Sequence, residues 1–138
     1  MMKLFALLAG LSFLACTDTG AAAGARQEQT SKAGATDQAS YVDLSPSEFA
    51  AKMKAPNTLV LDVRTPSEIA RGKIDGAVEL DYRAADFAER LAELGTDQTI
   101  LVYCASGGRS SSTAEMLVAN GAQKVFNLRG GYRAWQQQ

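Results

Sequence analysis

Short apolar runs alternate with amphipathic segments along most of this chain. The runs at residues 41–44, 58–63, 77–80, 99–103 and 124–128 are short and largely apolar, which is typical of buried β-strands. Segments with helical spacing lie between these runs and after the last one. Strands that alternate with helices predict an α/β fold, here a three-layer sandwich of about five mainly parallel strands flanked by helices.

Capping residues and glycines mark where the helices begin and end. Ser45-Pro46-Ser47-Glu48 and Thr65-Pro66-Ser67-Glu68 each combine an N-cap hydroxyl, a proline in the first turn and a glutamate three residues on, which predicts two helix starts. The second helix should be short and end near Arg71. Further helices are expected over residues 84–94, 111–120 and 131–137. The helical side chains expected to face the core are Phe49, Met53, Phe87, Leu91, Leu94, Ala114, Leu117 and Val118.

The first forty residues differ in composition from the rest. Lys3 and the apolar run 4–15 predict a secretory signal peptide over residues 1–15, too short to span a bilayer. Residues 17–40 contain no Val, Ile, Leu, Met or aromatic residue, so they cannot bury enough apolar surface to fold. We therefore expect a disordered tether at 16–40, or a tail without a role, and one domain without internal repeats at 41–138.

The end of the signal segment suggests a membrane anchor. Phe13-Leu14-Ala15-Cys16 resembles the signal of bacterial lipoproteins, in which the cysteine becomes the lipidated N-terminus, although Phe13 and Leu14 depart from the commonest pattern. The resemblance implies that Cys16 is lipidated and that the protein is exported and anchored to a membrane, facing the periplasm or the cell exterior. The alternative is a signal cleaved near a small residue, which would leave a soluble exported protein.

Charge and composition exclude several classes of function. The 14 basic and 15 acidic residues give a net charge of −1, which argues against nucleic acid as the main partner. The chain contains no histidine, which excludes a Cys–His pair, a Ser–His–Asp triad and any His-ligated metal. We expect neither a metal nor a cofactor. The chain has two cysteines, Cys16 and Cys104, in very different surroundings.

Cys104 begins the most informative segment of the chain, Cys104-Ala105-Ser106-Gly107-Gly108-Arg109-Ser110. A predicted strand precedes this segment and a predicted helix follows it. The backbone N–H groups of such a glycine-rich turn converge on one point, and the helix N-terminus adds positive potential there. A thiol in this place should have a lowered pKa and be a thiolate. We therefore predict that Cys104 is a nucleophile, with a buried structural cysteine as the alternative.

The other residues of this loop are predicted to support the thiolate. Backbone N–H donors would come from Ala105, Ser106, Gly107, Gly108 and Arg109. Ser106 and Ser110 could add hydroxyl donors, although Ser110 could equally be the N-cap of the next helix.

Arg109 has two possible roles. It could bind an anionic substrate directly, or it could brace the loop by pairing with a carboxylate, Glu68 or Asp62. We favour bracing. Asp62 and Arg64 end the second predicted strand near the site, where Asp62 is expected to hold loop N–H groups.

Four further residues near the site, three of them aromatic, are expected to be structural or solvated rather than to bind a ligand. Tyr82 and Arg83 are expected in a solvated loop that could also line the mouth of the pocket, and Tyr132 and Trp135 are expected in the core.

Four ordered motifs resemble those of the rhodanese-like sulfurtransferases. They are residues 61–68, 72–77, 104–110 and 128–135, and together they span the predicted domain. Lys73 and Asp75 depart from the family's usual histidine and proline in the second motif. The resemblance implies a rhodanese-like fold in which Cys104 carries the reaction.

The resemblance also implies sulfur transfer in two steps. Cys104 would take a sulfur from a small donor such as thiosulfate, hold it as a persulfide and pass it to cyanide or a thiol. We expect a monomer. One alternative is a non-catalytic module that uses the same loop to bind an anion or a protein. Another is a cysteine phosphatase or arsenate reductase, but these carry a seven-residue Cys-x5-Arg loop, whereas residues 104 to 109 make a loop of six.

Overall fold

Five parallel strands form one sheet in the computed structural model, which describes residues 40–138. The strands are β1 (Val42–Leu44), β2 (Thr58–Asp62), β3 (Val78–Glu79), β4 (Thr99–Tyr103) and β5 (Val125–Leu128). They lie in the order β1-β5-β4-β2-β3, and every neighbouring pair is parallel. The sheet therefore places β4 at its centre.

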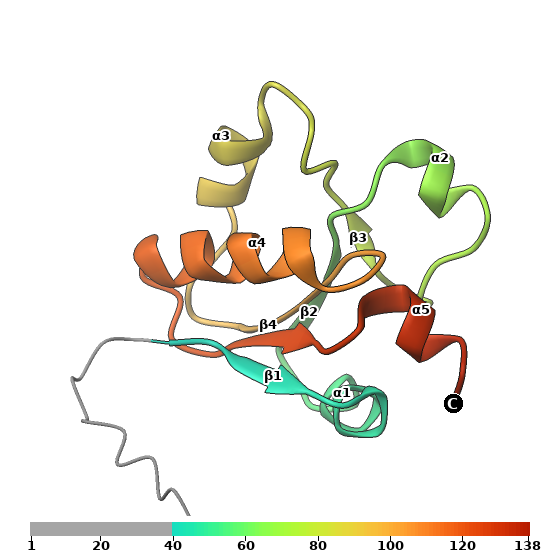
Figure 1. Ribbon diagram of the computed structural model, residues 1–138. Coiled ribbons are helices and arrows are strands. Elements are labelled where there is room, and N and C mark those ends of the chain that lie inside the picture. Colours follow the sequence, from blue (N-terminus) through green and yellow to red (C-terminus); the bar gives the residue numbers. More distant parts are fainter. Residues whose placement is uncertain (1–39) are drawn as a thin grey trace, which may run out of the picture. The chain divides into compact units, whose positions relative to one another are not determined.

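Helices cover both faces of this sheet. They are α1 (Pro46–Lys52), α2 (Pro66–Ile69), α3 (Phe87–Ala92), α4 (Gly108–Ala119) and α5 (Gly131–Trp135). Helices α3 and α4 lie on one face, and α1 and α5 lie on the other (Figure 1). The expected α/β sandwich of five parallel strands flanked by helices is confirmed.

The central strand supplies side chains to both layers of the core. Ile100 and Val102 belong to the core cluster under α3 and α4, whereas Leu101 and Tyr103 belong to the cluster under α1 and α5. All four are fully buried. Successive side chains of a strand point to opposite faces, so a strand with a helix layer on each side must be apolar throughout.

Both predicted capping motifs begin helices. The Glu48 carboxylate accepts a hydrogen bond from the N–H of Ser45 at 2.8 Å at the start of α1. The Glu68 carboxylate accepts one from the N–H of Thr65 at 3.0 Å at the start of α2. Each glutamate thus satisfies an N–H group that the helix itself leaves without a partner.

Some element boundaries differ from those expected. Helix α4 begins at Gly108 rather than at Ser111, because Gly107 adopts a left-handed conformation (φ 108°) and serves as the N-cap. Ser110 therefore lies inside the first turn, and the N-cap role considered for it is wrong. Helix α3 begins at Phe87 rather than at residue 84, since tight turns occupy the preceding residues, with the N–H of Ala84 bonded to the carbonyl of Asp81 at 3.0 Å.

The predicted signal peptide, the predicted lipidation site Cys16 and most of the predicted tether lie outside the described residues. Within residues 40–138, no helix is long and apolar enough to cross a membrane.

Candidate active site

Cys104 lies at the carboxyl end of the central strand β4, directly before the loop that leads into α4. Its side chain is buried, and its sulfur accepts hydrogen bonds from the Gly107 N–H at 3.1 Å and the Ser110 hydroxyl at 3.5 Å. Burial alone would raise the pKa of the thiol. The hydrogen bonds from Ser110, Ser106 and Gly107 outweigh burial and bring the pKa of Cys104 below its ordinary value. The pKa of Cys104 is therefore lowered, as the sequence predicted for a thiol at this place.

A hydrogen-bond network holds Gly107, whose N–H faces the sulfur. The Gly107 carbonyl accepts bonds from the Ser110 hydroxyl at 3.1 Å and from the N–H and hydroxyl of Ser111, both at 2.9 Å. The buried Asn127 of β5 donates to the Ser111 hydroxyl at 3.2 Å and to the Asp43 carboxylate at 2.7 Å. Strands β1 and β5 are thus linked to the first turn of α4. Asn127 was not singled out in the sequence.

The start of α5 holds the first two residues of the loop. The Tyr132 N–H donates to the Cys104 carbonyl at 2.7 Å, and the Arg133 N–H donates to the Ala105 carbonyl at 3.1 Å. Gly131 (φ 61°) packs so closely that a Cβ atom there would lie 2.5 Å from the Cys104 carbonyl oxygen and 2.6 Å from the Ser106 nitrogen. These contacts fix the positions of the first two residues of the loop.

Arg109 braces the end of the loop through Glu68. Its guanidinium makes two parallel hydrogen bonds to the Glu68 carboxylate, at 2.8 and 2.7 Å. Hydrogen bonding to Arg109 lowers the pKa of Glu68 to about 2, against the smaller opposing effect of burial. Of the two partners considered for Arg109, the structure places Glu68 beside it. This pairing ties α2 to the loop that follows Cys104.

Asp62, the last residue of β2, instead pairs with Arg64. The Asp62 carboxylate accepts hydrogen bonds from Arg64 Nε at 2.9 Å, from Nη2 at 2.6 Å and from the Arg64 backbone N–H at 3.0 Å. Both side chains are buried. The Arg64 guanidinium stacks on the ring of Tyr132, 4.1 Å from its centre, and Nη2 also donates to the Gly72 carbonyl at 2.9 Å.

Lys73 and Asp75, the two residues that depart from the usual second motif, lie near the edge of the sheet. Lys73 pairs with Glu79 of the edge strand β3 at 2.5 Å, and both side chains are exposed. Asp75 is also exposed. The Ile74 N–H between them still donates to the hydroxyl of the buried Tyr103 at 3.1 Å. Burial, with hydrogen bonding to Asp62, raises the pKa of Tyr103 well above its usual range.

Tyr82 and Arg83 differ from each other in exposure. Tyr82 lies in a turn after β3, as expected, but it is only partly exposed because its ring packs against Phe87, with ring centres 5.0 Å apart. Arg83 is exposed, as expected.

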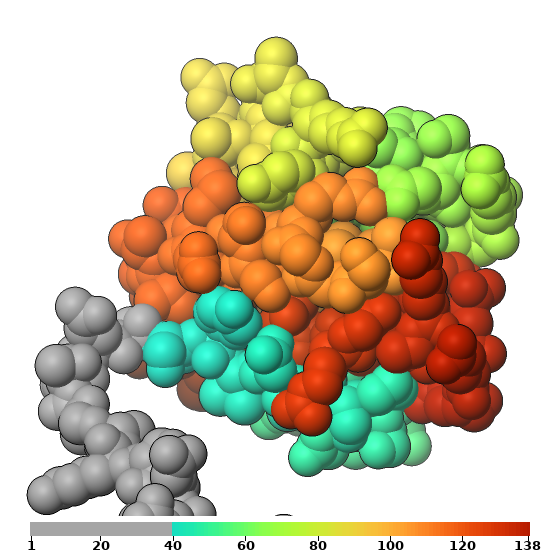
Figure 2. All heavy atoms as spheres, in the orientation of Figure 1, coloured from blue at the N-terminus to red at the C-terminus, as the bar shows by residue number. Residues whose placement is uncertain are grey.

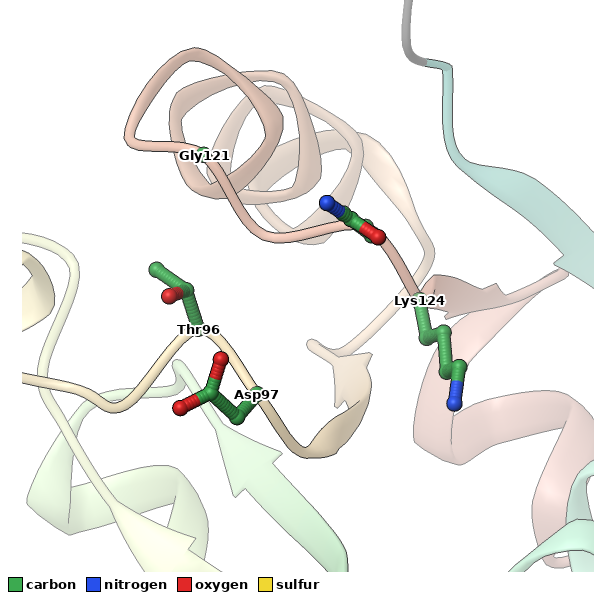
Figure 3. A pocket seen from close by; sticks show the side chains of 5 residues that line it. Thr96, Asp97, Gly121 and Lys124 are labelled. Atoms are coloured by element: carbon green, nitrogen blue, oxygen red, sulfur yellow. The ribbon is translucent and has the colours of Figure 1, made fainter.

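A polar depression lies at the opposite end of the strands from Cys104. It has a volume of about 170 Å³ and lies where Thr96 and Asp97 precede β4 and Lys124 precedes β5 (Figure 3). Ligands of parallel α/β sheets bind outside the carboxyl ends of the strands, where Cys104 lies. Among residues 40–138, no three His, Cys, Asp or Glu side chains gather as a metal site would require.

Comparison with known proteins assigns the family. The model of the rhodanese-like domain family matches residues 45–138, and the chain belongs to this family. It is 39% identical over 79 residues to a sulfurtransferase of Allochromatium vinosum, a match that covers 57% of this chain and 72% of the relative. It is 39% identical over 89 residues to thiosulfate sulfurtransferase GlpE of Pseudomonas entomophila, covering 64% and 79%.

A solved structure shows the same fold. The crystal structure of a rhodanese-related protein from Thermoplasma volcanium superimposes with a TM-score of 0.62 at 27% identity, covering 70% of this chain and 92% of that one.

Proposed function

We propose that this protein is a sulfurtransferase that carries a sulfur atom on Cys104 as a persulfide. One observation carries the proposal. The sulfur of Cys104 lies among backbone N–H groups and one hydroxyl, and the pKa of this thiol is lowered. In the first step the thiolate attacks the outer sulfur of thiosulfate. The sulfur–sulfur bond of thiosulfate breaks, and sulfite leaves with the electron pair. The N–H groups then stabilise the persulfide anion.

The second step returns the enzyme to its starting state. A thiolate or cyanide attacks the outer sulfur of the persulfide, the bond to Cys104 Sγ breaks, and the electron pair returns to Sγ. No proton shuttle is required, which suits a site without histidine. The relatives named as sulfurtransferases support this assignment.

The geometry of the loop disfavours phosphate chemistry. The six-residue loop from Cys104 to Arg109 encloses one sulfur atom, and the Arg109 guanidinium points to Glu68 with both of its terminal nitrogens. A phosphatase needs that guanidinium on the substrate oxygens.

Mass spectrometry of the intact protein tests the proposal. The full-length chain with Cys16→Ser has Cys104 as its one thiol. We expect thiosulfate to add the mass of one sulfur atom, and cyanide or dithiothreitol to remove it. The variant that also carries Cys104→Ser should gain nothing. A protein that stays unchanged in mass while its thiol reacts freely with iodoacetamide would contradict the proposal.

We further propose that the protein works in the cell envelope, anchored through a lipid on Cys16. The motif that ends in Ala15-Cys16 and the apolar run before it support this location. The full-length chain should be labelled when cells are given labelled palmitate, and the labelled protein should sediment with membranes. Cys16→Ser should abolish the label and release the protein from the membrane fraction. Labelling that persists in this variant would contradict the anchor.

A further inference from the structure

A cavity of about 260 Å³ lies between α2 and α5, beside the catalytic loop. The segments that contain α2 (green) and α5 (red) lie on the same side of the domain (Figure 2). The walls of the cavity include Arg64, Glu68, Arg71, Ala105, Tyr132 and Arg133. Its size is just below the range of roughly 300–1,000 Å³ typical of small-molecule pockets. The transfer of sulfur to Cys104 makes no use of it.

The cavity has a net positive charge. Arg64 is matched by Asp62, and Glu68 is matched by Arg109, so these two wall residues add no net charge. Arg71 and Arg133 are exposed, and neither takes part in an ion pair among residues 40–138. Two guanidinium groups therefore remain available to an anion, and guanidinium pairs well with carboxylates.

The cavity borders the catalytic loop at both of its ends. Ala105 directly follows Cys104, so the two Cα atoms are about 3.8 Å apart. Glu68 holds Arg109, the last residue of the loop. The cavity thus adjoins the loop at Ala105 and, through Glu68, at Arg109.

We propose that this cavity binds the carboxylate of the thiol that accepts sulfur from Cys104, with Arg71 and Arg133 as the residues that hold it. The inference rests on the proposed function. The acceptor thiolate attacks the outer sulfur of the persulfide, the bond to Sγ breaks, and the acceptor leaves as its own persulfide. Its carboxylate stands several bonds from the reacting sulfur, whereas the oxygens of thiosulfate are attached next to the transferred atom and stay at the loop.

Single-turnover kinetics with matched thiols test this inference. The full-length Cys16→Ser protein is loaded with thiosulfate, freed of excess donor and mixed with a thiol, and the loss of sulfur is followed by mass. The thiols are 3-mercaptopropionate and its methyl ester, with glutathione and its diethyl ester as a longer pair. Each pair differs in the charge of its carboxyl groups and in the added ester alkyl groups. The intrinsic reactivities of the two thiols cancel when the ratio of the acid rate to the ester rate is compared between variants, so the change in this ratio reports recognition of the carboxylate.

Removal of both guanidinium groups should reduce this ratio. We expect the double variant Arg71→Gln with Arg133→Gln to lower the acid-to-ester ratio about tenfold for whichever of the two thiol pairs is long enough to reach the cavity. A tenfold change corresponds to about 1.4 kcal/mol. Each single variant should lower it about threefold, and the single variants keep the test valid should the double variant fail to fold. Arg90→Gln with Lys124→Gln makes the same change in net charge at exposed positions on α3 and before β5, and should leave the ratio unchanged.

Two results would overturn the inference. One is a ratio that stays the same in the Arg71 and Arg133 variants for both thiol pairs. The other is an equal fall in the control variant, which would assign the effect to the overall charge of the protein. Failure of the parent protein to take up sulfur would contradict the proposed function instead, so the two failures are distinguishable.

Discussion

At the scale of single residues, the reactivity of Cys104 depends on the donors around its sulfur. A buried thiol normally has a raised pKa, because burial disfavours the charged form. Here the Ser110 hydroxyl and three backbone N–H groups reverse that effect. The buried Ser110 lies one residue after the loop, in the first turn of α4, where its hydroxyl can reach both Sγ and the Gly107 carbonyl.

Loss of the Ser110 hydroxyl should weaken the thiolate. We expect Ser110→Ala to raise the pKa of Cys104 and to slow its alkylation at neutral pH several-fold, because one donor to the anion is gone. The measurement is the rate of reaction with iodoacetamide as a function of pH. Ser112→Ala is the control, since that hydroxyl bonds to the Gly108 carbonyl. A pH profile that does not move in Ser110→Ala would show that backbone N–H groups alone set the pKa.

At the scale of elements, the loop takes its shape from three neighbours. Helix α5 binds the carbonyls of Cys104 and Ala105, α2 binds Arg109 through Glu68, and β5 binds Ser111 through Asn127. The loop is thus held at its start, at its end and on the first turn of α4. A site fixed on several elements keeps its donors in place without help from the substrate.

The contact between α5 and the loop leaves no space for a side chain. Gly131→Ala should cost about 3 kcal/mol of folding stability and slow persulfide formation, since its Cβ would collide with the backbone of residues 104–106. Urea unfolding and sulfur uptake measure the two effects. Gly121→Ala is a matched control, because Gly121 has φ 98° but open space around it. Equal stability losses in both variants would show that backbone strain, and not the collision, is the cause.

The link between α2 and the loop should depend on pH. Glu68 has a pKa of about 2 in the folded protein and about 4.5 when unfolded, so its contribution to stability is complete above pH 4.5 and is lost as the pH falls toward 2. We expect Glu68→Gln to reduce the free energy of unfolding by about 1 kcal/mol at pH 7.

Unfolding of both proteins by urea at several pH values checks this expectation. The difference between wild type and Glu68→Gln should shrink as the pH falls below 4.5. Glu89→Gln, at an exposed position of α3, should show no such difference. A difference that stays constant down to pH 3 would mean that the Arg109 pair is not its source.

At the scale of the whole molecule, the buried Asp62–Arg64 pair joins several parts of the domain. It connects the end of β2 to Gly72 and to the ring of Tyr132 on α5. Such a pair is expensive to break, because removal of one partner leaves a buried charge without compensation.

We expect Asp62→Ala to lower the free energy of unfolding by about 3–5 kcal/mol, a large share of the roughly 5–15 kcal/mol typical of a domain. Asp62→Ala combined with Arg64→Met should recover part of this loss, since no unpaired charge remains. Urea unfolding of the three proteins gives both values. A double variant less stable than the single one would show that the guanidinium stabilises the fold mainly by packing on Tyr132.

The sequence by itself determined the elements and pointed to the candidate nucleophile. Periodicity and capping located the five strands and five helices of residues 40–138, because short apolar runs and helix starts each leave a local pattern. Cys104 was evident because its strand, its glycines and its helix are consecutive in the chain. Boundaries were less accurate where a left-handed glycine, as at Gly107, starts a helix without a capping side chain.

The tertiary structure decided how the loop is held. Arg109 had two candidate partners, and only the fold brings Glu68, which lies 41 positions away, to its guanidinium. Asn127 and Gly131 act on the loop from β5 and α5 through contacts that no local pattern records. The cavity with Arg71 and Arg133 likewise exists only because α2 and α5 pack together. Local patterns arise from neighbours along the chain, whereas these contacts arise from the packing of distant elements.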